Sequence, residues 1–426
     1  MDDEEDVLEL GSRRQPRSVV TRLLIAIAVV CAVGGYFVVH GRGHPGERRT
    51  ALPRSSAPVV SSAPVGQPTP FVPSPSPSLP PWPQVAGACG SSAFVPIVSA
   101  VPLAQRTGVR VVVGDRLSTV DVDSATVTPR ADLPAGVYAT ELAAAGGSTY
   151  ASLIRCRPGG GATSTIVRLD AGGGLHTIAR GSYSDLLSGG NHPWGVIYHD
   201  DGTTSLDPLD GGAQVPVSAA FDPVAGYGND IVGAATVLSH SSSEGPQQVQ
   251  VIEPRSGKVV KVLGEALSMA VSRGVVLWTG ATCPQDQCPL LAYDLAAGRR
   301  VPVTASLPKD SGLWAAVLSP DRRSLVYVRQ QSGPSHYDMG HPGNPNEIAV
   351  VDLATGRTVA VPDVELWSKS SPGLAYSTDS HWLVMSFDAG SSVRLLLWEP
   401  GLEHALEPSV TVAGKVAFPP GLAALG

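Results

Sequence analysis

Three eleven-residue stretches of this chain repeat one pattern, and the repetition restricts the fold more than any other feature. The stretches are VDLATGRTVAV (Val351–Val361), YDLAAGRRVPV (Tyr293–Val303) and IEPRSGKVVKV (Ile252–Val262). In each, an alternating apolar run ends in Asp or Glu, a glycine follows four residues later, and a second alternating run begins. Alternation with a period of two is typical of a half-buried strand, and an acidic residue followed by glycine favours a tight turn. Each stretch is therefore predicted to be a strand, a turn and a strand.

Seven copies of this pattern follow one another along the chain. They begin at Asp121, Asp170, Asp207, Glu253, Asp294, Asp352 and Glu399. Glycine occupies the fifth position in five copies, whereas Ala125 and Glu403 stand there in the first and last. The copies start 37 to 58 residues apart. A repeat of this length with several strands indicates a β-propeller.

A second recurrent segment adds two more strands to each unit. AAVLSPDRRSLVYV (Ala315–Val328) and LAYSTDSHWLVMSF (Leu374–Phe387) both predict a strand, a Ser-x-Asp turn and a strand. The high counts of Gly (47) and Pro (38) disfavour long helices and favour turns. We therefore predict an all-β, seven-bladed propeller over residues 88–426, with six or eight blades as alternatives.

LSPDRRSLVYV followed by IAVVDLATGR resembles the repeats of TolB-like and WD40-like bacterial propellers, which read Ser-Pro-Asp-Gly and then Asp-x-x-x-Gly. Arg322 stands where those repeats have glycine. The resemblance covers Ala88–Gly426 and implies the propeller fold, but it selects no function because propellers support many activities. A ring of this kind must close to remove its edge strands. We expect closure between residues 415–425, KVAFPPGLAAL, and the first strands, Phe94–Val98 or Val109–Val113.

The residues before the propeller predict a membrane anchor. Leu23–Val39 carries no charge, and residues 19–39 together are long enough to cross a hydrocarbon core of ~30 Å as one helix. Arginines before the span favour a cytoplasmic N-terminus, so residues 1–18 are expected to be a disordered cytoplasmic tail and the propeller to be extracytoplasmic. A cleaved signal peptide and a lipoprotein modified at Cys31 are the alternatives.

Residues 40–87 predict a disordered linker. Of the 35 residues from Ala51 to Val85, eleven are Pro, and Ser and Ala supply much of the rest. Such a composition favours extended polyproline II rather than a packed core. The segment resembles the linkers of membrane-anchored envelope proteins of the actinobacterial, high-GC Gram-positive type.

Four cysteines lie beyond the anchor, and an even number in an exported domain favours disulfides. Cys283 and Cys288 are close enough in sequence to close a loop between two strands, which leaves Cys89 to pair with Cys156. A structural metal site is the alternative, but no further His or Cys flanks Cys283 and Cys288 at the spacing of a zinc site.

Polar loops supply the few candidate contact residues. Gln330–Glu347 is an insertion that contains His336, Asp338 and His341, which we treat as weak ligand-contact candidates. A second loop, SGGNHPWG, carries His192 and Trp194, both expected to be exposed. Four tryptophans near strands are expected to pack between blades: Trp278, Trp314, Trp382 and Trp398.

Function is constrained mainly by what the chain lacks. A formal charge of −7 argues against nucleic-acid binding, and no standard catalytic or cofactor motif occurs, so no cofactor or catalytic residue is assigned. The leading hypothesis is a non-catalytic module that binds a protein or cell-envelope ligand. The alternative is a lactonase-like or glycan-acting hydrolase. Three or more carboxylate or His side chains meeting at the central channel would favour the hydrolase, and an apolar or scattered channel would favour binding.

Overall fold

The computed structural model describes residues 84–413, with gaps at 87–91, 95–96, 114–116, 132, 135–136, 157–161, 171–172, 200–202, 219–220, 237–245, 331–335, 339–340, 344–345, 367–371 and 390–391. Contacts divide the chain into residues 1–75 and 76–426, and only the second unit contains described residues. The expected tail (1–18), transmembrane helix (19–39) and nearly all of the linker (40–87) lie outside them. No helix among the described residues is long and apolar enough to span a membrane.

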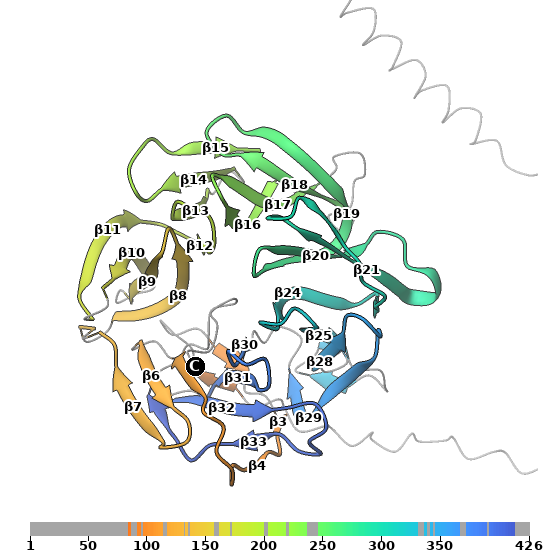
Figure 1. The fold of residues 1–426 in the computed structure, drawn as a ribbon. Helices are drawn as coiled ribbons and strands as arrows, with labels where there is room; N and C mark the ends of the chain where they lie inside the picture. The colour runs from red at the N-terminus through yellow and green to blue at the C-terminus, as the bar shows by residue number, and fades with distance from the viewer. Residues whose placement is uncertain are drawn as a thin grey trace, which may run out of the picture. The chain divides into compact units, whose positions relative to one another are not determined.

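The described residues form an all-β propeller, as predicted, whose antiparallel sheets follow one another along the chain (Figure 1). A three-stranded sheet holds β5 (Arg110–Val113), β6 (Ser118–Asp121) and β7 (Thr126–Pro129). The next holds β8 (Val137–Ala145), β9 (Ser148–Cys156), β10 (Ala162–Leu169) and β11 (Leu175–Gly181). The third holds β12 (Asp185–Leu187), β13 (Trp194–Tyr198), β14 (Thr204–Pro208) and β15 (Val215–Val217).

An eight-stranded sheet occupies the middle of the chain. It holds β16 (Phe221–Tyr227), β17 (Asp230–Thr236), β18 (Gln247–Glu253), β19 (Lys258–Ser272), β20 (Val275–Gly280), β21 (Gln287–Asp294), β22 (Arg299–Val301) and β23 (Ser306–Pro308). The long strand β19 pairs with β18 through its first half and with β20 through its second, and the two pairings meet at Ala266. A short 3-10 helix, η2 (Pro284–Asp286), precedes β21.

Two further sheets complete the described chain. One holds β24 (Ser311–Leu318), β25 (Ser324–Gln330), β28 (Asn346–Asp352) and β29 (Thr358–Leu366) together with β3 (Ile97–Val98). The other holds β30 (Gly373–Tyr376), β31 (Leu383–Asp388), β32 (Ser392–Trp398), β33 (Leu406–Glu407) and β34 (Val412–Ala413) together with β4 (Val101–Pro102). Separate two-stranded ribbons pair β1 (Gln84–Ala86) with β2 (Ser92–Phe94), and β26 (His336–Asp338) with β27 (His341–Gly343).

The repeated pattern forms the predicted hairpins. Asp352 ends β28, and its Oδ1 accepts hydrogen bonds from the backbone amides of Ala354 and Thr355 at 3.1 and 2.7 Å. Gly356 then takes a φ of 73° and leads into β29. Asp294 with Gly298, and Glu253 with Gly257, repeat this arrangement.

The copy at Asp207 departs from the prediction. Asp207 lies within β14, where its carboxylate accepts a hydrogen bond from the Tyr183 hydroxyl instead of capping a turn. The strand continues through Pro208, and the turn is closed by a bond from the Gly211 amide to the Pro208 carbonyl. The turn has therefore moved toward the second aspartate of this copy, Asp210.

The Ser-x-Asp turns form the second hairpin of the last two sheets. Ser319 donates to Asp321, whose Oδ1 also accepts the Arg323 amide at 3.1 Å. Ser377 and Asp379 repeat these bonds before β31. Arg322 has a φ of 60° and Ser380 a φ of 66°. Both turns therefore place a non-glycine residue in the left-handed region, where glycine is preferred.

Seven clusters of buried apolar side chains occur within the described residues: six lie between neighbouring sheets, and one lies between the two halves of the eight-stranded sheet. One of them joins the two ends of the described chain, because Val109 and Val111 pack with Val384 and Leu395. These clusters are the core of the molecule, and the cluster that contains Val109 and Val384 closes the ring.

Closure also involves the first strands, and the expected pairing of these strands with residues 415–425 stays a prediction. β3 pairs with β29, which matches Val98 to Val364, and β4 runs parallel to β33. The N-terminal strands thus add to the outer edges of the last two sheets. The expected C-terminal partner, residues 415–425, lies outside the described residues.

Neighbouring inner strands are joined by hydrogen bonds in which a backbone amide donates to a side-chain oxygen. Ser268 Oγ accepts the Leu313 amide at 2.8 Å, and Ser272 Oγ accepts the Leu318 amide at 3.1 Å. Figure 1 shows β8, β12, β16, β24 and β30 on the inner side of their sheets. These bonds satisfy amides that would otherwise lie unpaired between two sheets.

Three of the four tryptophans pack as predicted, and one does not. Trp278, Trp382 and Trp398 are buried in clusters between sheets. Trp314 is 48% exposed, so the prediction of packing between sheets is wrong for it. It lies in the irregular part of β24, where the register with β25 shifts between Gly312 and Val317.

We predict that Ser272→Ala destabilises the fold by about 1–3 kcal/mol, because the Leu318 amide would remain buried without an acceptor. Urea unfolding followed by tryptophan fluorescence measures the change. The control is Ser256→Ala, in an exposed turn where Ser256 Oγ accepts the Lys258 amide at 3.2 Å and water can replace it. We expect an effect within about 0.5 kcal/mol for the control. Equal effects of the two substitutions would refute this role of Ser272.

Candidate functional site

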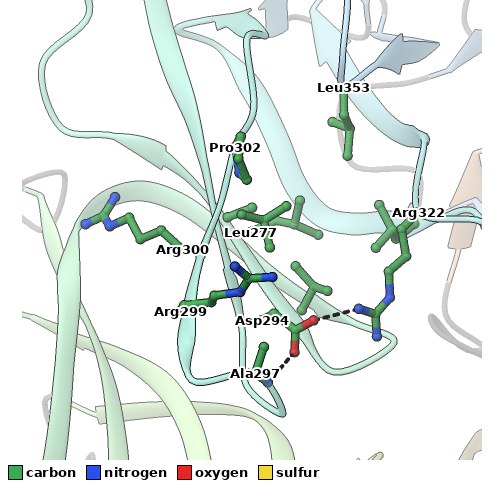
Figure 2. A pocket seen from close by; sticks show the side chains of 12 residues that line it. Leu277, Asp294, Ala297, Arg299, Arg300, Pro302, Arg322 and Leu353 are labelled. Atoms are coloured by element: carbon green, nitrogen blue, oxygen red, sulfur yellow. Dashed lines mark hydrogen bonds and ion pairs between the residues drawn. The ribbon is translucent and has the colours of Figure 1, made fainter.

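A cavity of about 310 Å³ lies between the eight-stranded sheet and the β24–β29 sheet (Figure 2). Strands β20, β21 and β22 form one side, and the turn between β24 and β25 with the end of β28 forms the other. Its apolar wall is made by buried side chains from both sheets: Val275, Leu277, Leu318 and Leu353. The residues of this wall lie far apart in the sequence and meet because the two sheets are neighbours.

Arg322 crosses from one side of the cavity to the other. Its Nη1 donates to Asp294 Oδ2 at 2.7 Å, and its Nη2 donates to the Arg273 carbonyl at 3.0 Å. Arg273 in turn donates to the Leu318 carbonyl at 3.1 Å. Burial, and then the positive charge of Arg322, lower the pKa of Arg273. The two guanidinium groups are therefore close enough to repel each other.

A third arginine lines the cavity without a partner. Arg299 is exposed and has no hydrogen-bond or ion-pair partner among the described residues. The next residue, Arg300, points away from Asp294 in Figure 2: its guanidinium lies 5.0 Å from the Trp278 ring centroid and donates to the Leu263 carbonyl. Of these neighbours on β22, only Arg299 has a free guanidinium that can meet a ligand.

Among the described residues that line the cavity, Asp294 is the only carboxylate, and it is held as an ion. The Ala297 amide donates to it at 2.9 Å, and this bond, followed by the Arg322 guanidinium, keeps the pKa of Asp294 below its ordinary value. A carboxylate stabilised in this way is a poor general base. The side chains that line the cavity can therefore bind an anion and an apolar group.

A comparable groove lies between the β8–β11 sheet and the β12–β15 sheet, with different chemistry. It is lined by Tyr150 and Arg168 on one side and by the Asp207–Gly211 turn on the other. The turn that lines this groove carries two carboxylates, Asp207 and Asp210, whereas the first cavity has one, Asp294, among its described lining residues. A third cavity, on the β8–β11 sheet, is lined by Arg155 and Arg180, so arginines line more than one cavity of the described residues, while the pairing of Arg322 with Asp294 belongs to the first.

A second group of polar side chains lies on the inner strands. Glu141 on β8, Asp185 at the start of β12 and Asp222 on β16 come from three successive sheets. The Leu186 amide donates to Glu141 Oε2 at 2.6 Å, and the Tyr198 hydroxyl donates to Asp222 Oδ1 at 2.8 Å. We call Glu141, Asp185, Asp222 and Tyr198 the inner-strand acidic group.

Burial and neighbouring carboxylates raise the pKa of three members of this group. Burial, and then the charge of Asp185, raise the pKa of Glu141 to about 8. Burial, and then the charge of Asp222, raise the pKa of Asp185, although its surface is partly open to water. Burial and the carboxylate of Asp222 also raise the pKa of Tyr198. Carboxyl groups with separated pKa values are a feature of acid–base sites, and they also arise in structural clusters.

For the contact candidates singled out from the sequence, the structure describes the backbone only. His336 and Asp338 belong to β26 and His341 to β27, and the backbones of Asp338 and His341 pair in a hairpin. Their side chains are outside the described part of the structure, so their role as contacts stays a prediction. Within the described residues, no group of three or more His, Cys, Asp or Glu side chains is arranged to hold a metal ion.

The disulfide prediction is confirmed for one pair. Cys283 and Cys288 are bonded, with their Cα atoms 4.0 Å apart, and close the loop between β20 and β21. The pair Cys89–Cys156 falls outside the described side chains. Trp194 was expected to be exposed but is buried at the start of β13, because it packs with Val196 and Phe221.

Comparisons with known proteins agree with the fold and go no further. No family model and no curated protein matches the chain. Among solved structures, TolB from Acinetobacter baumannii is 13% identical, with a TM-score of 0.36, over 60% of this chain and 61% of that one. The β-propeller domain of the Trilobed protease from Pyrococcus furiosus is 11% identical, with a TM-score of 0.39, over 64% and 84%.

A puromycin-hydrolyzing peptidase from Mycobacterium tuberculosis is 13% identical, with a TM-score of 0.42, over 73% of this chain and 52% of that one. This chain therefore spans about half the length of that peptidase. These solved structures are only distantly similar to this chain, so they do not distinguish a binding protein from a hydrolase.

We predict that Glu141 makes the fold less stable as the pH rises from about 4.5 to about 8. The pKa of Glu141 is higher in the folded chain than its ordinary value of 4.5. Between these two pKa values the folded state keeps a proton on Glu141 that the unfolded state has lost, so the free energy of unfolding falls as the pH rises through this interval. Glu141→Gln keeps an acceptor for the Leu186 amide without the charge. The variant should lose less stability than the wild type between pH 5 and pH 8 when thermal unfolding is compared.

The control for this experiment is Glu403→Gln, because Glu403 is an exposed carboxylate without a partner among the described residues. It should keep the pH dependence of the wild type. If Glu141→Gln also keeps it, Glu141 is ionised in the folded chain and the assignment of its pKa is wrong.

Proposed function

We propose that the chain is a single-pass membrane protein whose extracytoplasmic, seven-bladed propeller binds a protein or cell-envelope ligand without transforming it. The blade number is supported by six apolar clusters between sheets and a seventh between the two halves of the eight-stranded sheet. The eight-stranded sheet counts as two blades that share β19, and the three-stranded sheet counts as one. On this proposal the chain belongs among the membrane-anchored, TolB-like propellers of the actinobacterial type.

The location is supported by two observations. Leu23–Val39 is uncharged and, with the residues before it, long enough to span a bilayer. The Cys283–Cys288 disulfide suits an oxidising compartment outside the cytoplasm. We accordingly assign the N-terminus to the cytoplasm and the propeller to the outer side, and we expect no nucleic-acid partner.

Binding is supported by one observation above all: the cavity between β20–β22 and β24–β28 is equipped for recognition. Ligand sites usually combine an apolar wall with a few polar groups in a volume of ~300–1,000 Å³. The cavity of about 310 Å³ has the apolar wall and the free Arg299 guanidinium. Its one carboxylate, Asp294, is already neutralised by Arg322.

The inner-strand acidic group keeps a hydrolase as a second candidate. Three carboxylates on successive inner strands are the feature that we expected of an enzyme. In that case Glu141, with a pKa of about 8, would be the proton donor, and Asp185 would be the ionised partner. Lactonase-like chemistry that depends on a metal held by these groups finds no support, because the described residues form no metal-binding cluster.

An extraction experiment separates binding from catalysis. The full chain in lipid nanodiscs and its Arg299→Gln variant are incubated with an envelope extract of the cells that produce it, and the molecules retained by each are identified by mass spectrometry. We expect one or more molecules that the wild type enriches at least about fivefold over the variant. These molecules should be recovered unchanged after prolonged incubation with the wild type.

The hydrolase makes a different prediction in the same experiment. A retained molecule that the wild type converts, and that Asp185→Asn binds but does not convert, would establish the second candidate and overturn the first. If Arg299→Gln retains everything that the wild type retains, the cavity is not the binding site and the proposal fails.

A further inference from the structure

We infer that the cavity binds an organic anion, a carboxylate or phosphate attached to a short apolar chain. The inference rests on the proposed binding function and adds the chemical class of the ligand. We call the site, made by Arg299, Arg322 and the wall of Val275, Leu277, Leu318 and Leu353, the arginine cavity.

The charge of the arginine cavity selects an anion. Arg273, Arg299 and Arg322 lie at or beside it, and Asp294 is the only carboxylate among the residues that line it. Arg322 uses Asp294 and the Arg273 carbonyl as acceptors, which leaves Arg299 without one. The positive charge is therefore in excess, and Arg273 already responds to it through a lowered pKa. An incoming anion would relieve this repulsion.

The geometry of the guanidinium group suits an oxyanion. A planar guanidinium donates two parallel hydrogen bonds to a carboxylate or phosphate, which a lysine cannot do. In Figure 2 the Arg299 and Arg322 side chains approach Asp294 from opposite sides. An anion would accept hydrogen bonds from Arg299, whose donors are free, while Arg322 neutralises the neighbouring Asp294 carboxylate.

The apolar wall selects the rest of the ligand. Leu277 and Leu318 are almost fully buried, so the apolar surface that a ligand can meet comes mainly from Val301, which is half-buried, and Pro302, which is exposed. A short alkyl or acyl chain that packs on this surface would leave water. The volume of about 310 Å³ lies at the lower end of ligand cavities, so the chain must be short.

The backbone at Arg322 is unusual for a residue with a side chain. Its φ of 60° is in the left-handed region, where glycine is preferred. The equivalent turn before β31 has the smaller Ser380, with a φ of 66°. The long side chain of Arg322 lets its guanidinium reach Asp294 across the cavity.

Titration calorimetry of the full chain in nanodiscs tests the inference with four probes: hexanoate, hexyl phosphate, hexylamine and acetate. We expect hexanoate or hexyl phosphate to bind the wild type, and hexylamine and acetate to bind at least about tenfold more weakly. The comparison of hexanoate with hexyl phosphate shows which anionic group is preferred. Arg299→Gln should weaken the preferred probe about tenfold, the loss of one charge-assisted hydrogen-bonded pair.

Two variants make the result specific to the cavity. Arg323→Gln removes the same charge from an exposed neighbour of Arg322 that does not line the cavity, so its affinity should equal that of the wild type. Arg322→Gly should weaken binding about tenfold and remain folded, because glycine suits the φ of 60°. Hexylamine binding as strongly as hexanoate, or equal affinities of Arg299→Gln and the wild type, would overturn the inference.

The outcomes also separate this inference from the proposed function. A neutral or cationic molecule retained from the envelope extract in an Arg299-dependent way would uphold the binding function and overturn the organic anion as its ligand. Binding of hexanoate that all variants share would show partition into the nanodisc only, and would equally overturn the inference.

Discussion

Hydrogen bonds between neighbouring inner strands are the interaction on which the rest of the structure depends. Ser268 and Ser272 on β19 accept the amides of Leu313 and Leu318 on β24, and Glu141 on β8 accepts the amide of Leu186 on β12. In both β8 and β19 a register shift precedes the accepting residue, and a bulge of this kind re-aims a side chain. The donors lie about one repeat further along the chain than the acceptors. At these junctions one unit therefore positions the next, and the apolar clusters form between units held at that distance.

Local structure could be predicted because its causes are local. An acidic side chain that accepts the amides of its own turn, as Asp352 does, needs no information from the rest of the molecule. The Cys283–Cys288 disulfide was predictable for the same reason. The prediction failed where a distant residue competed: Asp207 leaves its turn because the Tyr183 hydroxyl binds its carboxylate. Trp314 was assigned to the core by its residue type, but the irregular backbone of β24 exposes it.

The candidate sites were not predictable, because each is made by side chains that meet only across sheets. Arg299 and Arg322 appear in the sequence as ordinary arginines after turns, and nothing in their spacing shows that both face one cavity. The one available signal was the departure of Arg322 from the glycine of related repeats. Glu141, Asp185 and Asp222 each occupy a different inner strand. Their convergence follows from the closure of the ring, which no single repeat encodes.

The pairing of β3 with β29 and of β4 with β33 has a consequence for how the chain reaches its folded state. The earliest strands of the propeller cannot find their partners until almost the whole domain has been synthesised. Contacts of such long sequence separation are slow to form, and the outer edges of the last two sheets stay open meanwhile. If the domain is exported, the cell must prevent association between unfinished chains until the two ends meet, which makes ring closure the step most exposed to intermolecular strand exchange.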